Sequence, residues 1–179
     1  VRVDIIRNGD LIAPSFDEYR FLRDHVTSMI GLAAYESGPA RIEIQGAPYM
    51  GAQVTYVTAN MLDVLGATLH HGTGLLPADD GIGTGRPVAI LSHYFWKTQM
   101  GEDPGVVGRT IVINKRPLTV VGVLDLAFYG LRRPVDVWLP LALYEASPAS
   151  ECCVAVAGRL RRGVSASQAT VELQMLHQR

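Results

Sequence analysis

The chain has 179 residues, of which 48% are hydrophobic and 18% are charged, a composition typical of a globular protein rather than a disordered one. Its 16 lysines and arginines nearly balance 17 acidic residues, so the charge does not favour binding to nucleic acid. A chain of this length buries about 70% of its unfolded surface, and folding therefore requires neither a disulfide nor a metal.

The only two cysteines, Cys152 and Cys153, are adjacent. Neighbours on a strand point to opposite faces, which favours two buried thiols, although a vicinal disulfide stays open. No window reaches the roughly 18 apolar residues that span a bilayer, and no signal peptide is recognisable. Because the first residue is Val1 rather than methionine, we expect the chain to be a segment of a longer protein.

The first third of the sequence predicts strand, helix and two further strands. Alternating apolar residues predict a strand over residues 1–7. Ser15 and Glu18 have the spacing of a capping box, which predicts that a helix begins there, and we expect it to end at Gly31. The apolar face of this helix is formed by Tyr19, Leu22, Val26 and Met29.

Two strands are predicted on either side of a loop over residues 46–51. Asn60 is expected to cap a short helix over residues 61–65, ended by Gly66. The next segment, residues 66–87, contains six of the 18 glycines and two of the ten prolines, and we expect it to be mostly loop.

The centre of the chain predicts a β-rich module with one helix. Residues 88–91 form a buried strand, and Ser92 caps a helix over residues 93–100 that ends at Gly101. Residues 110–114 and 118–123 predict a hairpin with Pro117 at the end of its turn, because proline cannot donate to a ladder. Residues 136–141 predict another extended segment.

The C-terminal part predicts a strand over residues 152–160 and a helix. Ser165 and Gln168 form a second capping box, and the helix presents one face made of Ala166, Ala169, Leu173 and Leu176. The pattern indicates an α+β fold in which both chain ends build a mixed body around a β-rich insertion.

Ser92 and His93 raise the question of a nucleophile and its base. Consecutive residues at a helix start lie about 100° apart, so adjacency does not aim one at the other. The sequence also lacks a G-x-S-x-G elbow. We therefore expect Ser92 to be a helix cap and His93 a surface residue, and we expect no catalytic residue in this chain.

Two other patterns could bind a ligand. His70 and His71, followed by Asp79 and Asp80, could hold a metal, but the sequence has no H-E-x-x-H or C-x-x-C spacing. The glycines of "GIGTGR" (81–86) could hold a phosphate, but they follow a loop and no Lys-Ser/Thr completes the motif. A polar loop is the expected structure for both, with no metal and no cofactor.

Basic and aromatic residues could form an interface. Arg132 and Arg133 make one short basic cluster that could touch a partner or lipid headgroups, although the pattern favours a solvated surface. Trp96 and Trp138 are expected mainly in the core. The run from Tyr94 to Trp96 places too many aromatic residues on one helix face, so one of them should face a second subdomain or a partner.

In their order along the chain, several segments resemble the periplasmic core domain of MacB-like and FtsX-like ABC transporter permeases. The resemblance covers about residues 15–173, and the ordered set is more specific than any single segment. The segments are "VTANMLDVLGATLHHGTGLLPADD", "RPVAILSHYFWKTQMGEDPGVVGRTIVINKRPLTVVGVL", "VDVWLPLAL" and "VAGRLRRGVSASQATVEL".

The resemblance implies a domain on the extracytoplasmic, periplasmic side of the bacterial inner membrane, between the first and second membrane helices of a permease. It implies a mixed porter-like subdomain, which we place at residues 1–65 plus 149–179, and an inserted, mostly β Sabre-like subdomain at residues 66–148. Four apolar helices, one before Val1 and three after Arg179, are expected in the full-length protein. At "HHGTGLL" the sequence departs from relatives that carry Gly-Arg.

The implied function is mechanotransmission, the relay of ATP-driven conformational change, in a dimer with a second permease copy. The implied partners are a cytoplasmic ATPase module and an adaptor (membrane fusion) protein, a lipoprotein or an export substrate. The loop over residues 66–87 and the residues near the subdomain junction are candidates for the coupling surface. The candidate interface residues are Trp96, Trp138, Tyr94, Arg132 and Arg133. The alternative is a stand-alone small-molecule-binding domain of the same fold.

Overall fold

A computed structural model describes most of the chain. The described residues are 2–3, 5–7, 10–12, 14–44, 46–80, 85–128, 130, 134–144 and 154–177, with side chains described from residue 14 onwards. Both cysteines and the Arg132–Arg133 cluster lie outside the described residues, as does most of the "GIGTGR" segment.

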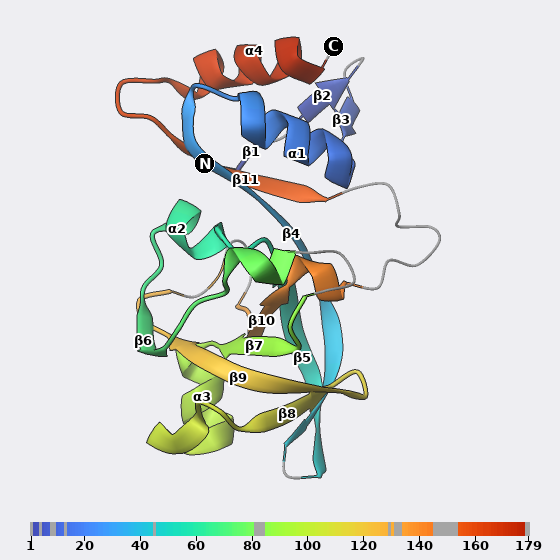
Figure 1. The fold of residues 1–179 in the computed structure, drawn as a ribbon, viewed down its shortest axis with the longest axis vertical. Coiled ribbons are helices and arrows are strands. Elements are labelled where there is room, and N and C mark those ends of the chain that lie inside the picture. Colours follow the sequence, from blue (N-terminus) through green and yellow to red (C-terminus); the bar gives the residue numbers. More distant parts are fainter. Residues whose placement is uncertain are drawn as a thin grey trace.

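The chain forms two bodies joined by the long strand β4 (Met29–Ile44), with both chain ends in the upper body (Figure 1). This arrangement confirms the predicted fold class. The upper body contains β1 (Arg2–Val3), β2 (Ile5–Arg7), β3 (Asp10–Ile12), α1 (Phe16–His25), β11 (Ala155–Leu160) and α4 (Ala166–His177). The lower body contains β5 (Ala47–Val57), α2 (Met61–Leu65), β6 (Leu69–Gly72), β7 (Val88–Leu91), α3 (His93–Met100), β8 (Thr110–Ile113), β9 (Arg116–Leu124) and β10 (Val137–Pro140), with short 3-10 turns η1 (Pro77–Asp80), η2 (Pro104–Val106) and η3 (Leu141–Leu143).

Strand β4 takes part in both bodies. Its first half pairs antiparallel with β11, and its second half pairs antiparallel with β5. The change occurs at Tyr35, which is opposite Ala155 on one side and Val57 on the other. The predicted domain boundaries at residues 65/66 and 148/149 stay predictions. The pairing shows that β5, which precedes residue 66, joins both β4 and β10.

The strands of the lower body close into a ring. The pairing runs from β4 through β5, β10, β7, β9 and β8, and β8 pairs back onto β4. The β5–β10 and β7–β9 pairs are parallel, and the others are antiparallel. Closure leaves these strands with few unpaired edges, which stiffens the lower body and protects it from edge-to-edge association.

Three hydrophobic clusters fill the two bodies. The upper cluster packs Tyr19 and Leu22 of α1 and Leu173 of α4 onto β4 and β11. One lower cluster packs Phe95 and Trp96 of α3 against the strands of the ring. The third contains residues of both bodies: it joins Ala33 on β4, Ala157 on β11, Met61 on α2 and Trp138 on β10.

Helix α1 begins where its capping box predicts and ends earlier than predicted. Ser15 accepts a hydrogen bond from the Glu18 backbone, and the Glu18 carboxylate accepts one from the Ser15 backbone. The predicted end at Gly31 is wrong: the helix ends at His25, and Gly31 lies inside β4. The β-branched residues at 26 and 27 disfavour helix.

The segment predicted as a loop over residues 46–51 is mostly strand. Ile44 pairs with Ala47, and the chain reverses at Gly46, whose φ of +83° suits glycine. Pro48 lies in β5 opposite Glu43. The prediction failed because edge positions of a sheet tolerate the missing N–H of proline.

Residues 66–87 also contain more structure than predicted, since β6 pairs with β9 and η1 follows it. The buried strand at 88–91 and the helix at 93–100 have the predicted bounds. Pro117 lies inside β9 opposite Val112 rather than at the turn. Within the described ranges, no helix combines the length and apolarity needed to cross a bilayer.

Candidate functional site

Ser92 is a helix cap. Its hydroxyl oxygen accepts a hydrogen bond of 3.1 Å from the Phe95 backbone, its own N–H donates to the Asp136 carbonyl, and its side chain is buried. The Ser92 hydroxyl therefore serves as the N-cap of α3. Neither of the two cavities described below is lined by Ser92 or His93, so the arrangement gives no support to a nucleophile and base.

His93 packs among rings instead of standing alone on the surface. Its ring centroid lies 5.3 Å from that of Trp96 and 5.4 Å from that of His70. Its Nδ1 atom is buried and has no hydrogen-bond partner among the described residues. The prediction of a surface histidine is correct only for part of the side chain, which is half-buried.

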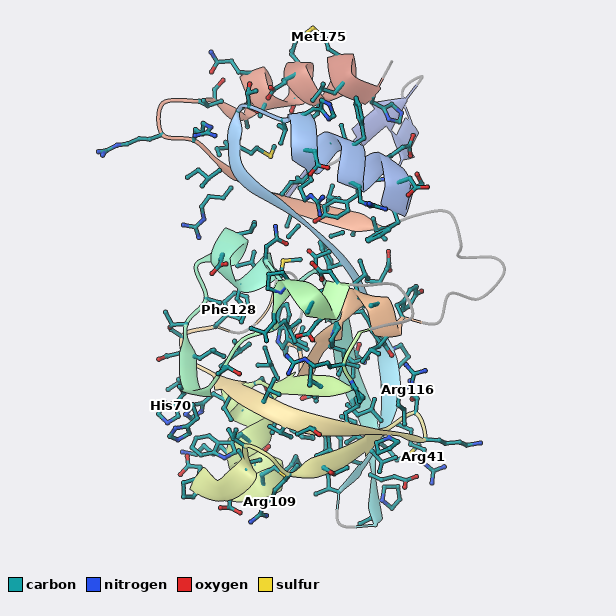
Figure 2. All side chains as sticks on the ribbon, viewed as in Figure 1. Arg41, His70, Arg109, Arg116, Phe128 and Met175 are labelled. Carbon is teal, nitrogen blue, oxygen red and sulfur yellow. The ribbon has the colours of Figure 1, made fainter. Side chains whose placement is uncertain are left out.

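His70 and His71 meet Trp96 because strand β6 carries an irregularity. Leu69 is opposite Leu124 and His71 is opposite Val123, so His70 is an extra residue in β6. Such a bulge re-aims neighbouring side chains, and both imidazole centroids lie 5.3 Å from the Trp96 rings. Figure 2 shows His70 where β6 meets α3.

The acidic pair that follows the histidines does not join them. Asp79 is fully buried and accepts hydrogen bonds of 2.7 and 3.0 Å from Arg86 and one of 2.7 Å from the Leu76 backbone. Burial acts to raise the pKa of Asp79, but these bonds outweigh it and hold the pKa below its usual value. No group of three histidine, cysteine or acidic side chains in the described part of the chain is arranged to hold a metal.

The described candidate interface residues differ in exposure. The Trp138 side chain is 1% exposed and packs near Phe128, and Trp96 is 5% exposed, with its Nε1 donating to the Asp103 carbonyl at 2.9 Å. Tyr94 is 60% exposed. Of these three, only Tyr94 is placed to touch another molecule directly; Arg132 and Arg133 lie outside the described residues.

The contact between the two bodies is polar at its edges. Arg159 on β11 donates from Nε to the Val64 carbonyl at 2.7 Å, close to the C-terminus of α2, where a cation also meets the negative end of the helix dipole. Asn60 donates to the Leu32 carbonyl at 2.9 Å, although no side-chain cap bond from Asn60 to α2 forms. These bonds fix the lower body against β4 and β11.

A cavity of about 390 Å³ lies at this junction. Its lining residues come from α1 of the upper body and from two segments of the lower body. They are Phe16, Tyr19, Arg20, Arg23, Thr58, Pro77 and Asp80. Sequence reasoning missed this site; the spacing of residues 16, 19, 20 and 23 on one helical face was the available signal.

The cavity combines opposite charges with an aromatic wall. Arg23 donates to Asp24 at 2.8 Å, and its guanidinium lies 5.9 Å from the centre of the Tyr19 ring. Asp80 accepts a hydrogen bond of 2.7 Å from the Ala59 backbone. Burial raises the pKa of the Asp80 carboxyl above its usual value, although Ala59 and Arg23 act against this rise.

A second cavity, of about 290 Å³, lies between β4, η3 and the β8–β9 turn. Tyr56, Leu139 and Tyr144 contribute apolar and aromatic surface, and Asn114 and Arg116 contribute polar groups. Its lining thus combines apolar and polar groups without a cluster of one kind. The chain continues from Tyr144 into residues outside the described part.

Comparison with known proteins gives a family and a fold. The family model described as "MacB-like periplasmic core domain" matches residues 5–176. The periplasmic region of MacB from Actinobacillus actinomycetemcomitans superposes with a TM-score of 0.76 at 16% identity, covering 99% of this chain and 81% of that one. The extracellular domain of YknZ, a noncanonic ABC-type transporter from Gram-positive bacteria, gives 0.70 at 14% identity, covering 99% and 93%. Comparison with curated protein sequences finds no match.

Proposed function

Because the chain belongs to the family of MacB-like periplasmic core domains, the outer domains of ABC transporter permeases, we propose that it relays ATP-driven conformational change from the membrane segments outward. The domain is a transporter component and carries out no chemistry in this proposal. ATP hydrolysis belongs to a cytoplasmic ATPase module, and a second permease copy completes the dimer.

The observation that carries this proposal is the continuity of β4. This strand is paired along its length first in the upper body and then in the closed ring of the lower body. Because one strand is paired in both bodies, a displacement of the upper body moves the ring with it. Rigid-body motion of this kind is a common way to transmit a two-state change.

The surface that would meet an adaptor protein, a lipoprotein or an export substrate is proposed to include Tyr94. Its 60% exposure fits direct contact, whereas Trp96 and Trp138 are buried and would act by holding α3 and β10 in place. Arg132 and Arg133 remain candidates from the sequence. Single replacement of Trp96 and Trp138, with transport and folding both measured, tests their part.

The relay is tested in the full-length permease, reconstituted with its ATPase module, with Cys152 and Cys153 replaced by serine. Spin labels at Met50→Cys and Met175→Cys, two exposed positions, report one distance within the domain. We expect ATP to leave this distance unchanged and to alter the distance between the Met50→Cys labels of the two copies. An unchanged distance between copies would remove the relay.

A stand-alone small-molecule-binding domain is the second candidate function. The two cavities, of about 290 and 390 Å³, favour it, because small-molecule sites are concave and of roughly this size or larger. Thermal unfolding against a panel of small molecules tests it, since a ligand that binds only the folded state raises the unfolding temperature.

A further inference from the structure

The junction cavity has positive groups on one wall and a negative group on the other. Arg20 and Arg23 come from α1, and Asp80 comes from η1. The positive wall therefore belongs to the upper body, and the negative group belongs to the lower body. A molecule that satisfies both walls must carry both signs of charge.

The two arginines keep donors available. Arg23 uses its Nε in the bond to Asp24, and Arg20 lies 4.0 Å from Asp17 through one terminal nitrogen. A guanidinium has five N–H donors and suits planar anions such as carboxylate and phosphate. Both side chains are more than one third exposed, at 58% and 39%, so an entering anion can reach them.

Asp80 forms no ion pair with the described residues, although Arg23 lines the same cavity. Within the described residues, its carboxylate has no cationic group within 4.0 Å and accepts one hydrogen bond, from the Ala59 backbone at 2.7 Å. A half-buried carboxylate with a single backbone donor is incompletely compensated. An ammonium group, with three N–H donors, would supply the positive charge and the further hydrogen bonds that this carboxylate can accept.

Aromatic rings line the space between the charged walls. The Phe16 and Tyr19 rings lie 5.7 Å apart, and both line the cavity. Aromatic faces attract cations and accept short apolar chains. An ammonium group beside Asp80 and its adjoining carbon atoms therefore fit this surface.

We propose that the junction cavity binds a small zwitterion, with its primary ammonium at Asp80 and its carboxylate or phosphate at Arg20 and Arg23. A simple anion would be repelled by Asp80, and a simple cation would be repelled by the two guanidinium groups. The volume of about 390 Å³ admits a dipeptide or a phosphoethanolamine group. The bound molecule contacts both bodies, and the site stands whether or not the domain relays motion.

Calorimetric titration of the 179-residue chain at pH 7 and low salt tests this proposal. The ligands are phosphoethanolamine and alanyl-alanine, compared with ethanolamine, inorganic phosphate and acetate, which each carry only one of the charges. We expect at least one zwitterion to bind in the millimolar range or tighter, and the singly charged compounds to bind at least about tenfold more weakly, because each leaves one wall unpaired.

Arg23→Gln and Asp80→Asn should each weaken binding by about tenfold or more. The matched controls are Arg41→Gln and Glu43→Gln, a pair 3.4 Å apart on β4, with Arg41 at the lower end of the molecule (Figure 2); they should leave binding unchanged. The comparison of zwitterions with singly charged compounds on the wild-type protein tests the proposal even if a variant fails to fold.

Three results overturn the proposal. They are binding of phosphate or ethanolamine as tight as that of the zwitterions, absence of zwitterion binding at millimolar concentration, and zwitterion binding that survives both Arg23→Gln and Asp80→Asn. The source of the ligand is then separated with vesicles. Co-sedimentation with phosphatidylethanolamine but not phosphatidylcholine vesicles, lost in both variants, supports a lipid headgroup; binding of the soluble zwitterions alone supports a free metabolite or peptide.

Discussion

Glu172 joins α4 to the turn between α1 and β4. Its carboxylate accepts hydrogen bonds of 2.7 and 2.6 Å from the Thr27 backbone and hydroxyl, and one of 2.9 Å from the Ser28 backbone. Burial acts to raise the pKa of Glu172, but the bonds from Ser28 and Thr27 outweigh it and lower the pKa to about 2. This carboxylate therefore holds α4 against the segment that joins α1 to β4 in the upper body.

We expect Glu172→Gln to lower the free energy of unfolding by about 2 kcal/mol at pH 7, because it weakens hydrogen bonds to a charged group. Since the folded pKa is depressed, this stabilisation is present above the ordinary glutamate pKa and is lost as the pH falls toward about 2. Urea denaturation at pH 7 and pH 3 should show a smaller difference between wild type and variant at pH 3. Glu43→Gln, beside exposed Arg41, is the control and should change stability little at either pH.

Ser92 gives a second prediction at the scale of the residue. Ser92→Ala should lower the free energy of unfolding by about 1 kcal/mol, because the Phe95 N–H loses its acceptor, and Ser92→Thr should restore most of it. Thermal or urea unfolding measures both variants. Labelling by a serine-directed probe that disappears in Ser92→Ala would contradict the assignment of Ser92 as a cap.

At the scale of elements, the β6–β9 pair depends on the absence of a side chain at residue 122. A Cβ on Gly122 would lie 2.6 Å from the Thr73 carbonyl oxygen and 3.2 Å from that of His71. Both obstacles are backbone atoms, which cannot move without separating the strands. The histidine cluster on β6 therefore depends on a glycine of its partner strand.

We expect Gly122→Ala to lower the free energy of unfolding by about 2 kcal/mol or more, in the range of overpacked sites. Gly38→Ala is the matched control, because Gly38 also lies in a strand and nothing lies within 4 Å of its added Cβ. This control should be neutral or slightly stabilising. Equal losses in the two variants would show that the close approach of the strands is not the cause.

At the scale of the whole molecule, the shared strand and the shared hydrophobic cluster should make the two bodies unfold together. Both tryptophans lie in the lower body, whereas α1 and α4 lie in the upper body. Tryptophan fluorescence thus reports on the lower body, whereas far-ultraviolet circular dichroism also includes the helices of the upper body. Coincident transitions by two probes are the sign of two-state unfolding.

We expect the two urea midpoints to coincide in the wild type. Insertion of two glycines between Tyr35 and Glu36, where β4 passes from one body to the other, should separate them, because it loosens the strand while keeping the alternation of its faces. Separate midpoints in the wild type would show two independent bodies and would weaken the proposed relay. Insertion of two glycines after Gly163, in the turn before α4, is the control.

Features that depend on neighbouring residues could be predicted from the amino-acid sequence. They are the capping boxes at Ser15 and Ser165, the buried strand at 88–91 and the bounds of α3. Caps and periodicity act over a few residues, so they can be recognised locally. The ordered motifs also predicted the family.

Three other features follow from the packing of distant segments. They are the length of β4, the bulge that turns His70 and His71 toward Trp96, and the placement of Arg23 and Asp80 around one cavity. Each depends on which distant segments pair. Local propensity does not encode that choice. Gly31 and Pro48 favour turns, yet both lie in strands, because pairing and burial stabilise the extended backbone there.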